Sequence, residues 1–464
     1  MRRKVVVIGA GPAGMAAAIE AAARNCDVTV LDEAPRPGGQ IYRQAHPRLT
    51  GTEYAETTEL ARKKRLLRRF DEVARAIDYR AGAEVYAAFR NGEIHVRNKD
   101  RTEVLKPDAV VLATGVRERA IPFPGWTLPG VMFAGGAQSM LKSQRTSPGR
   151  VAVVAGCGPL PIVVASQLAR ANARIAALAT LHSPLAILRD AGGAWHGRDI
   201  LREGVRYAQS FLRTGSARLT GYVPIRALGT QRLEAVRLAR VDEHGRVVPG
   251  TPREIACDLL AVNYGFIANS ELAAMAGARM RHERDAGFWL PETDDEGRTS
   301  LPWLFAAGDA AGVRGALVAE SEGTIVGAAA AGLGPETAPS QALEEAIGMR
   351  RRYGAFARAV RRTLRVPTAL WSTTTDDTIV CRCENVPLSQ IRAAFDGAHR
   401  SLNAIKRNAR PGMGWCGGRM CAHSVAVLTE LHAGVAPGNM ITPRPMARPV
   451  PFAALVQQTQ GRPQ

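Results

Sequence analysis

Long apolar runs are absent from the 464-residue sequence, which contains no stretch of about 18 such residues that could span a bilayer. The N-terminus, Met1-Arg2-Arg3-Lys4 followed by apolar residues, superficially imitates a signal peptide. Glycines at nucleotide-binding spacing interrupt this apolar stretch. We therefore expect no transmembrane segment and a cytoplasmic protein, with peripheral attachment to the inner membrane left open.

Acidic residues are also few relative to basic ones, with 42 Asp and Glu against 61 Lys and Arg and a formal charge of +19. Such a surface favours acidic partners, nucleic acid or anionic lipid. The excess is spread along the chain, with local basic runs at 62–69 and 350–365, and the first run has no interleaved aromatic residue that would stack on bases. Both runs are expected to be helical, no nucleic-acid partner is expected, and the second run could dock an acidic subunit.

Cysteine is too scarce for a disulfide scaffold, with seven residues in the chain. Cys26, Cys157 and Cys257 are isolated in apolar surroundings, whereas the other four lie near the C-terminus, as metal ligands would. The length and the 46% apolar and 22% charged content predict a soluble protein of two or three domains.

A glycine-rich turn near the N-terminus follows the apolar run 5–8 and precedes a helix of small residues. The first glycine permits a tight turn, the second lets the backbone approach a pyrophosphate, and the third lets the helix pack closely on the strand. The helix N-terminus would face the phosphate charge. The candidate ligand-binding residues of this turn are Gly9, Gly11, Pro12, Ala13 and Gly14.

A second strand, 28–31, ends in Asp32 and Glu33, where an acid should meet a ribose hydroxyl. FAD and NAD share this pattern, and three later segments favour FAD. They are Gly38-Gly39-Gln40, the strand and turn ending in Thr114-Gly115, and the strand and turn ending in Gly308-Asp309.

In this order the segments resemble the two-dinucleotide-binding-domain flavoproteins, the family of pyridine-nucleotide disulfide reductases and their relatives, over residues 1–335. The resemblance implies an α/β fold whose FAD domain, 1–120 and 245–335, contains an inserted second Rossmann-like domain, 121–244. It also implies that Gly308-Asp309 approaches the ribityl and phosphate part of FAD. Thr114-Gly115 would mark the crossing out of the FAD domain. Relatives that reduce disulfides carry a redox cysteine pair, and 38–42 and 130–136 lack one, which excludes that chemistry.

The second dinucleotide turn, Gly156-Cys157-Gly158-Pro159-Leu160-Pro161, has proline in place of its third glycine. The next strand, 175–178, runs into Ala179-Thr180 without an acid for NAD or an arginine for a 2′-phosphate. We therefore predict a degenerate NAD(P)-type domain. An adenine nucleotide in a structural role or an empty site is favoured over a working NAD(P)H site, and Pro161 weighs against even the adenine nucleotide.

Four cysteines follow a linker with a basic helix, 336–376: Cys381 and Cys383, then Cys416 and Cys421. Four thiolates can hold zinc or a [2Fe-2S] cluster, or stay unligated. Structural zinc sites usually bring C-x-x-C pairs. The C-x-C pair beside a glycine-rich second pair instead favours two irons, with peptide N–H groups pointing at sulfur. A helix beginning near Cys421 would favour its thiolate.

Residues 377–435 resemble the bacterioferritin-associated-ferredoxin-like [2Fe-2S] domain, a small helical module. The four residues between the last two cysteines resemble the version fused to FAD subunits of bacterial opine oxidases, D-hydroxyproline dehydrogenases and hydrogen cyanide synthase. Those subunits share the run 122–131, and heteromeric archaeal-type proline dehydrogenases are also similar. The resemblance implies a flavin-containing beta subunit, similar to amino-acid oxidases, that oxidises the amine; a small third subunit is a further candidate. The Pro-rich tail, 436–464, is expected to be extended.

The predicted function is therefore that of an electron-transferring FAD and [2Fe-2S] subunit of a heteromeric dehydrogenase for an opine, D-hydroxyproline, proline or glycine. No acid–base pair or nucleophile marks a catalytic residue in this chain, and its candidate histidines are isolated: His46, His182, His196 and His282. One alternative is an NAD(P)H-dependent ferredoxin-type reductase. Another is a nucleic-acid-binding or regulatory protein with a cysteine-bound sensor.

Overall fold

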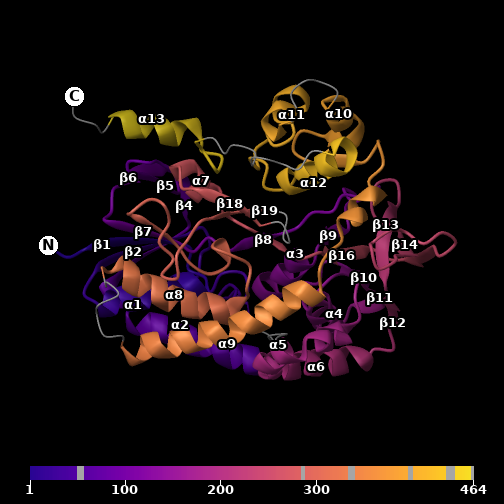
Figure 1. Cartoon of the computed structure of the whole chain (residues 1–464), viewed down its shortest axis with the longest axis horizontal. Coiled ribbons are helices and arrows are strands. Elements are labelled where there is room, and N and C mark those ends of the chain that lie inside the picture. Colours follow the sequence, from indigo (N-terminus) through magenta and orange to yellow (C-terminus); the bar gives the residue numbers. More distant parts are fainter. Residues whose placement is uncertain (50–56, 284–287, 333–339, 396–400, 435–444, 461–464) are drawn as a thin grey trace.

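The computed structural model describes residues 1–49, 57–283, 288–332, 340–395, 401–434 and 445–460. Two dinucleotide folds lie side by side, and a small helical domain covers one side of them (Figure 1). Among these residues no helix combines the length and apolarity needed to cross a membrane.

The first dinucleotide fold is a parallel sheet in the order β20-β7-β1-β2-β3. Apart from the edge strand β3, which is polar and partly exposed, these strands are mostly apolar and buried, as parallel strands covered on two sides must be. Their bounds are β1 Lys4–Ile8, β2 Asp27–Asp32, β3 Ile77–Ala81, β7 Ala109–Leu112 and β20 Leu304–Ala306.

Helices α1 (Pro12–Ala23) and α8 (Ala316–Ala330) cover one face of this sheet in close contact. A Cβ added at Gly323 would lie 2.1 Å from the Ala13 carbonyl oxygen, so small residues are required at this crossing. Helix α2 (Thr57–Glu72), followed by η1 (Ala74–Ala76), packs beside α1. An antiparallel sheet covers the other face: β4 Ala83–Ala88, β5 Ile94–Asn98 and β6 Arg101–Leu105.

The second dinucleotide fold repeats this plan with the sheet order β12-β11-β10-β16-β9. Its strands are β9 Val131–Phe133, β10 Val151–Gly156, β11 Arg174–Thr180, β12 Ala217–Thr220 and β16 Leu259–Asn263. An antiparallel sheet adds β13 Tyr222–Leu228, β14 Ala235–Arg240 and β15 Arg253–Ala256. The helices are α3 Ala134–Ser139, η2 Met140–Gln144, α4 Leu160–Arg170, η3 Pro184–Asp190, α5 Ala191–His196 and α6 Arg198–Leu212.

The expected return to the FAD domain at residue 245 is wrong. Strand β16 pairs in parallel with β10 and β9, so the second sheet continues to Asn263. The chain leaves through β8 (Val116–Glu118) and returns through β17 (Phe266–Ala268), which pair with each other. Residues 259–263 form a buried interior strand of the second sheet, a role that composition alone did not reveal. Four further elements complete the first fold: α7 Glu271–Ala276, β18 Met280–Glu283, β19 Phe288–Pro291 and η4 Gly308–Ala310.

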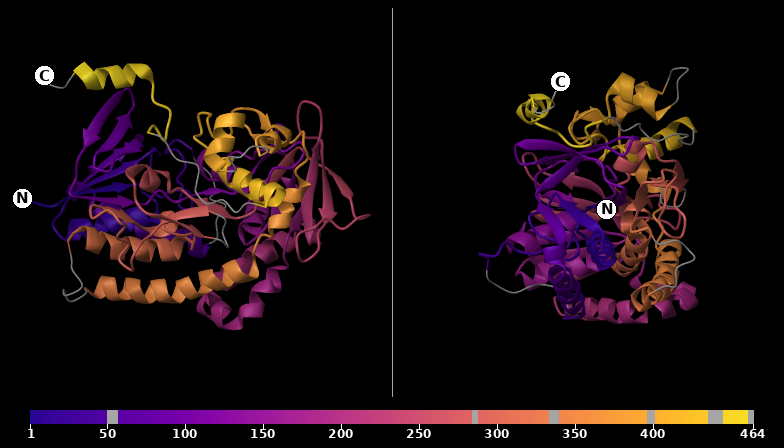
Figure 2. Two further views of the ribbon diagram at one scale, coloured as in Figure 1. Left: turned by 45° about the horizontal axis from the view of Figure 1, so that its top comes forward. Right: turned by 90° about the vertical axis from the view of Figure 1, so that its left-hand side faces the viewer.

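Both basic runs are helical, as expected. Helix α9 (Gln341–Thr363) begins at the Ser340 cap, whose side chain accepts from the Leu343 amide, and lies along α8 and α5 (Figures 1 and 2). The small domain follows η5 (Thr368–Thr373). It contains β21 Ile379–Cys381, β22 Val386–Pro387, α10 Leu388–Ala393, α11 Leu402–Ala409 and α12 Ala422–Ala433.

The tail was expected to be extended, but residues 452–460 form a helix, α13 (Phe452–Gln460), which lies on β6 above the first fold (Figure 2). The Thr102 hydroxyl donates to the Ala454 carbonyl at 2.9 Å. No proline falls within Phe452–Gln460, so these residues can form a helix without interruption. Residues 436–444 and 461–464 of the expected extended tail lie outside the described residues.

Candidate cofactor sites

The first glycine turn connects β1 to α1 and tolerates no side chain at two of its three glycines. A Cβ at Gly9, whose φ is +101°, would lie 2.4 Å from the Ala113 carbonyl oxygen. A Cβ at Gly14 would lie 1.7 Å from the Gly9 carbonyl oxygen. These two glycines therefore shape the turn itself.

Gly11 differs, because its backbone is extended at φ −75° and an added Cβ would meet only the Gly39 Cα, at 3.8 Å. It is the N-cap of α1, which has no side-chain cap and no acid in its first turn, while Pro12 begins the helix. Gly39, at φ +61°, faces Gly11. Bare backbone at an uncapped helix N-terminus suits the close approach of a pyrophosphate.

Asp32 ends β2 beside this turn and accepts hydrogen bonds from the amides of Ala10, at 2.5 Å, and Ala34, at 2.6 Å. Burial raises the pKa of the Asp32 carboxyl, and the two backbone hydrogen bonds oppose that rise. Glu33 instead pairs with Arg448 of the tail at 2.7 Å, a contact that the sequence did not suggest.

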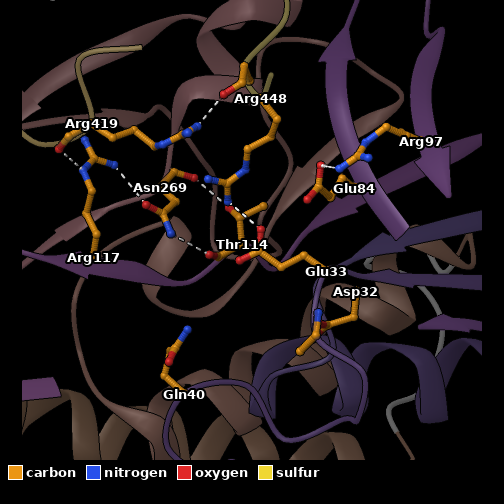
Figure 3. Close-up of polar contacts among 12 residues, drawn as sticks. Asp32, Glu33, Gln40, Glu84, Arg97, Thr114, Arg117, Asn269, Arg419 and Arg448 are labelled. Atoms are coloured by element: carbon orange, nitrogen blue, oxygen red, sulfur yellow. Dashed lines mark hydrogen bonds and ion pairs between the residues drawn. The ribbon is translucent and has the colours of Figure 1, made fainter. Parts of the chain in front are cut away.

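Gln40 and Gly308 complete the set at the carboxyl end of the first sheet. Figure 3 shows Gln40 projecting from its loop toward the side on which Thr114 lies. Gly308, at φ +65°, leaves only 2.7 Å between an added Cβ and the Ala13 Cβ. The predicted FAD residues are therefore brought together at one edge of the sheet, where open α/β folds bind ligands.

Asp309 follows Gly308 and accepts from the amides of Arg314, at 2.8 Å, and Gly315, at 3.0 Å. Burial raises the pKa of its carboxyl. Below it Glu322 is 5% exposed and pairs with Arg314 at 3.0 Å, and burial raises the Glu322 pKa to about 7. Glu322 is a buried acid that sequence reasoning missed, because nothing in an alanine-rich helix marks which acid is buried.

Thr114 and Gly115 lie where the chain leaves the first fold. The Thr114 hydroxyl donates to the Asn269 carbonyl at 2.6 Å, and the Asn269 side chain donates to the Thr114 carbonyl at 2.9 Å. The Asn269 amide also donates to Gly115 at 2.9 Å. These bonds join the outgoing and returning strands, so the crossing lies at the predicted residues.

The second glycine turn is covered by the chain's own linker. The Cys157 thiol donates to the Leu364 carbonyl at 3.0 Å, and burial raises the Cys157 pKa to about 12. His182, just after β11, contacts the Arg365 carbonyl at 2.6 Å. Cys157 shares a buried cluster with Leu370 and Trp371. Linker residues thus lie at the carboxyl ends of β10 and β11, where a dinucleotide would bind.

The four C-terminal cysteines come together as two pairs. Cys381 hydrogen-bonds with Cys421, and Cys383 with Cys416. The bond with Cys421, together with the amides of Gly412, Glu384 and Cys383, lowers the Cys381 pKa to about 6. Two thiol pairs, with backbone amides directed at sulfur, fit a two-iron cluster better than one zinc ion.

Gly414 shows how closely the second cysteine segment approaches the first. A Cβ at Gly414 would lie 2.4 Å from the Cys383 Cβ. Cys381, Cys416 and Cys421 are buried, while Cys383 is half-buried. Cys421 is the N-cap of α12, as the helix pattern predicted.

The fold and the paired thiols define a flavoprotein with two dinucleotide folds and a fused iron–sulfur domain. Residues 3–216 and 224–332 match the model of the pyridine nucleotide-disulphide oxidoreductase family, and residues 379–429 match the BFD-like [2Fe-2S] binding domain. An opine oxidase subunit of Rhizobium meliloti is 34% identical, with 98% of this chain and 87% of the relative covered. The hydrogen cyanide synthase subunit HcnB of Pseudomonas aeruginosa is 31% identical, with 98% of both covered.

The chain therefore belongs to the pyridine nucleotide-disulphide oxidoreductase family, in the branch that contains this opine oxidase subunit together with HcnB. It is an oxidoreductase that binds FAD and a [2Fe-2S] cluster. The structure of L-proline dehydrogenase from P. horikoshii has the same fold, with a TM-score of 0.67 at 18% identity over 98% of this chain and 80% of that one.

Proposed function

We propose that this chain is the electron-transferring subunit of a heteromeric dehydrogenase whose amino or imino acid site lies on a partner subunit. The relatives at 31–34% identity are named as subunits of opine oxidase and hydrogen cyanide synthase. The observation that carries the proposal is a direct contact between β8, beside the proposed FAD site, and the loop that carries two of the proposed cluster ligands. Arg117, next to the FAD-domain crossing, donates to the Arg419 carbonyl, which lies between two cluster cysteines, at 2.7 Å.

FAD would bind at the carboxyl edge of the first sheet. Its pyrophosphate would lie over the backbone of the turn Gly9–Gly14 and its ribose near Asp32 and Glu33, with the rest bounded by Gly39-Gln40, Thr114-Gly115 and Gly308-Asp309. Cys381, Cys383, Cys416 and Cys421 would hold the cluster. FAD exchanges one or two electrons and the cluster exchanges one, so together they convert a two-electron oxidation into single steps.

Two of the four candidate histidines have structural contacts. His182 contacts the Arg365 carbonyl, and His282 packs against Trp289 with ring centroids 4.6 Å apart and the rings inclined at 49°. A catalytic base needs to lie within reach of the proton that it removes. We therefore assign the amine oxidation to a flavin-containing partner similar to amino-acid oxidases. We place the complex in the cytoplasm and assign it no nucleic-acid partner. The substrate class is an opine, D-hydroxyproline, proline or glycine, and a small third subunit is a further candidate partner.

The cluster-ligand loop, residues 411–421, offers the partner an exposed apolar surface. Trp415, which precedes Cys416, is 74% exposed, and Met413 is 41% exposed. Tryptophan is enriched among the residues that dominate protein–protein binding energy. This loop is the place at which we expect the partner to dock and exchange electrons with the cluster.

An NAD(P)H-dependent ferredoxin-type reductase is the alternative, and it requires a nucleotide in the second fold. The linker contacts of Cys157 and His182 favour a fold without one, since even an adenine nucleotide would have to displace residues 364–371. In an anaerobic titration we expect NADH and NADPH to leave the flavin oxidised. Bleaching within a turnover time would favour the reductase instead.

Co-purification with the product of the neighbouring gene tests the proposal, followed by a screen of amino and imino acids with an artificial dye acceptor. The complex should reduce the dye with one substrate class, and this chain alone should not. Efficient oxidation of an amino acid by the isolated chain would contradict the proposal.

A further inference from the structure

Two arginines connect the cluster-ligand loop to the first dinucleotide fold. Arg419 lies between the cysteines at 416 and 421, and its carbonyl accepts from Nε of Arg117 at 2.7 Å (Figure 3). Arg117 lies on β8, three residues after Thr114. A residue at the crossing of the FAD domain therefore touches the backbone that carries two cluster ligands.

The Arg117 guanidinium is held on its other side by the returning strand. Its Nη1 donates to Oδ1 of Asn269 at 2.9 Å and to Oε1 of Glu271 at 2.6 Å, and this ion pair is only 20% and 17% exposed. Asn269 is the residue that exchanges two hydrogen bonds with Thr114. The planar fork of arginine can satisfy the loop carbonyl and this carboxylate together, which the single ammonium of lysine does poorly.

A second connection runs through the side chain of Arg419 into the tail. Arg419 donates to the Ala447 carbonyl, and the Ala447 amide donates to the Tyr86 carbonyl at 2.6 Å. The next residue, Arg448, pairs with Glu33 at 2.7 Å. The cluster-ligand loop is thus tied to both ends of the proposed FAD site, at Thr114 and at Glu33.

Other contacts attach the body of the cluster domain elsewhere. Trp126 donates to the Ile379 carbonyl at 2.6 Å, and Ser424 donates to the Ala120 carbonyl at 2.6 Å. Loss of Arg117 should therefore leave the domain attached and folded. The variant would lose the contact that holds the loop between Cys416 and Cys421 in position.

We propose that Arg117 is a positioning residue for electron exchange between FAD and the cluster. This inference rests on the proposed electron-transfer function. By bonding the Arg419 carbonyl and Glu271 together, Arg117 fixes the ligand loop at a constant position relative to the turn Thr114-Gly115. Small displacements of reacting groups slow reactions strongly, and electron exchange depends steeply on separation.

The test compares Arg117→Ala with Arg97→Ala in the full chain carrying both cofactors. Arg97 is a matched control, because it pairs with Glu84 at 2.6 Å, is similarly buried at 24% exposure, and lies in the same domain (Figure 3). A light pulse in the presence of a sacrificial electron donor such as EDTA reduces the flavin anaerobically, and cluster absorbance and its EPR signal then report electron arrival. In Arg117→Ala we expect arrival to slow about tenfold, with FAD and iron content and both midpoint potentials unchanged. Arg97→Ala should match the wild-type chain, and Arg117→Lys should be intermediate.

Wild-type exchange rates in Arg117→Ala, with both cofactors retained, would overturn the role of Arg117 and leave the proposed function intact. If Arg117→Ala loses a cofactor, Glu271→Gln decides, because it removes the carboxylate charge that anchors the Arg117 guanidinium and so frees the contact of Arg117 with the loop carbonyl. Slower exchange in Glu271→Gln supports the role, and an unchanged rate overturns it. A wild-type chain in which no electron reaches the cluster would refute the proposed function and this role with it.

Discussion

Replacing Gly11 by alanine separates the binding of FAD from the folding of its domain. The residue has φ −75°, which alanine adopts freely, and the added methyl would meet protein only at 3.8 Å. Changing the N-cap from glycine to alanine should cost the apoprotein about 1 kcal/mol or less. If the pyrophosphate lies on this backbone, the methyl occupies its space, and overpacking of that kind costs about 1–3 kcal/mol. FAD should then bind about ten- to a hundredfold more weakly, at about 1.4 kcal/mol per factor of ten.

The assay for Gly11→Ala is an FAD titration of the apoprotein followed by flavin fluorescence, beside urea unfolding of the same sample. Gly204→Ala in α6 is the matched control, because nothing lies within 4 Å of the added Cβ there and FAD affinity should stay unchanged. Gly14→Ala should instead fail to fold, given the 1.7 Å approach to the Gly9 carbonyl oxygen. An unchanged dissociation constant in Gly11→Ala would refute the placement of the pyrophosphate.

Three other outcomes follow from the cluster, the buried acids and the exposed tryptophan. Gly414→Ala should lose most of its iron and sulfide while keeping FAD, because the methyl would lie 2.4 Å from the Cys383 Cβ. The control Gly348→Ala, whose added Cβ lies in open space, should lose neither iron nor FAD. Full iron content in Gly414→Ala would contradict this prediction. Burial raises the pKa of both Glu118 and Glu322 to about 7 from the ordinary 4.5, so the folded chain holds protons that the unfolded chain releases. The free energy of unfolding of the apoprotein should therefore fall as the pH rises from 4.5 to about 7 and then level off. Glu118→Gln should flatten that slope in urea titrations. An unchanged slope would exclude Glu118 as a cause. Trp415→Ala should weaken association with the partner by about 2 kcal/mol in calorimetry at unchanged iron content, and unchanged affinity would place the partner elsewhere.

The local signatures were predictable because each depends on a few neighbouring residues. The glycines at 9 and 14 are required by backbone contacts within one turn, and the two cysteine pairs meet as their spacing and glycines indicated. The crossing at Thr114-Gly115 was likewise found, because a strand running into a small-residue turn is a local pattern. Whether these residues contact FAD stays a prediction.

The rest depends on contacts between residues far apart in sequence. Arg117 and Arg419 are separated by 302 positions, and Cys157 and Leu364 by 207, so no local pattern announced either contact. The second domain was predicted to end at residue 244, because the insertion of β16 between β10 and β9 depends on topology and not on a local pattern. The helix at 452–460 was missed because the extended tail was predicted from the proline content of 436–464 as a whole.

The most direct test of the central claim is freeze-quench EPR on the complex of this chain with its partner, mixed anaerobically with the amino or imino acid that it oxidises. The account predicts that the signal of the reduced [2Fe-2S] cluster develops within a turnover time, and only when both subunits are present. A cluster that stays oxidised while the substrate is consumed, or one that substrate reduces in the isolated chain, would contradict it.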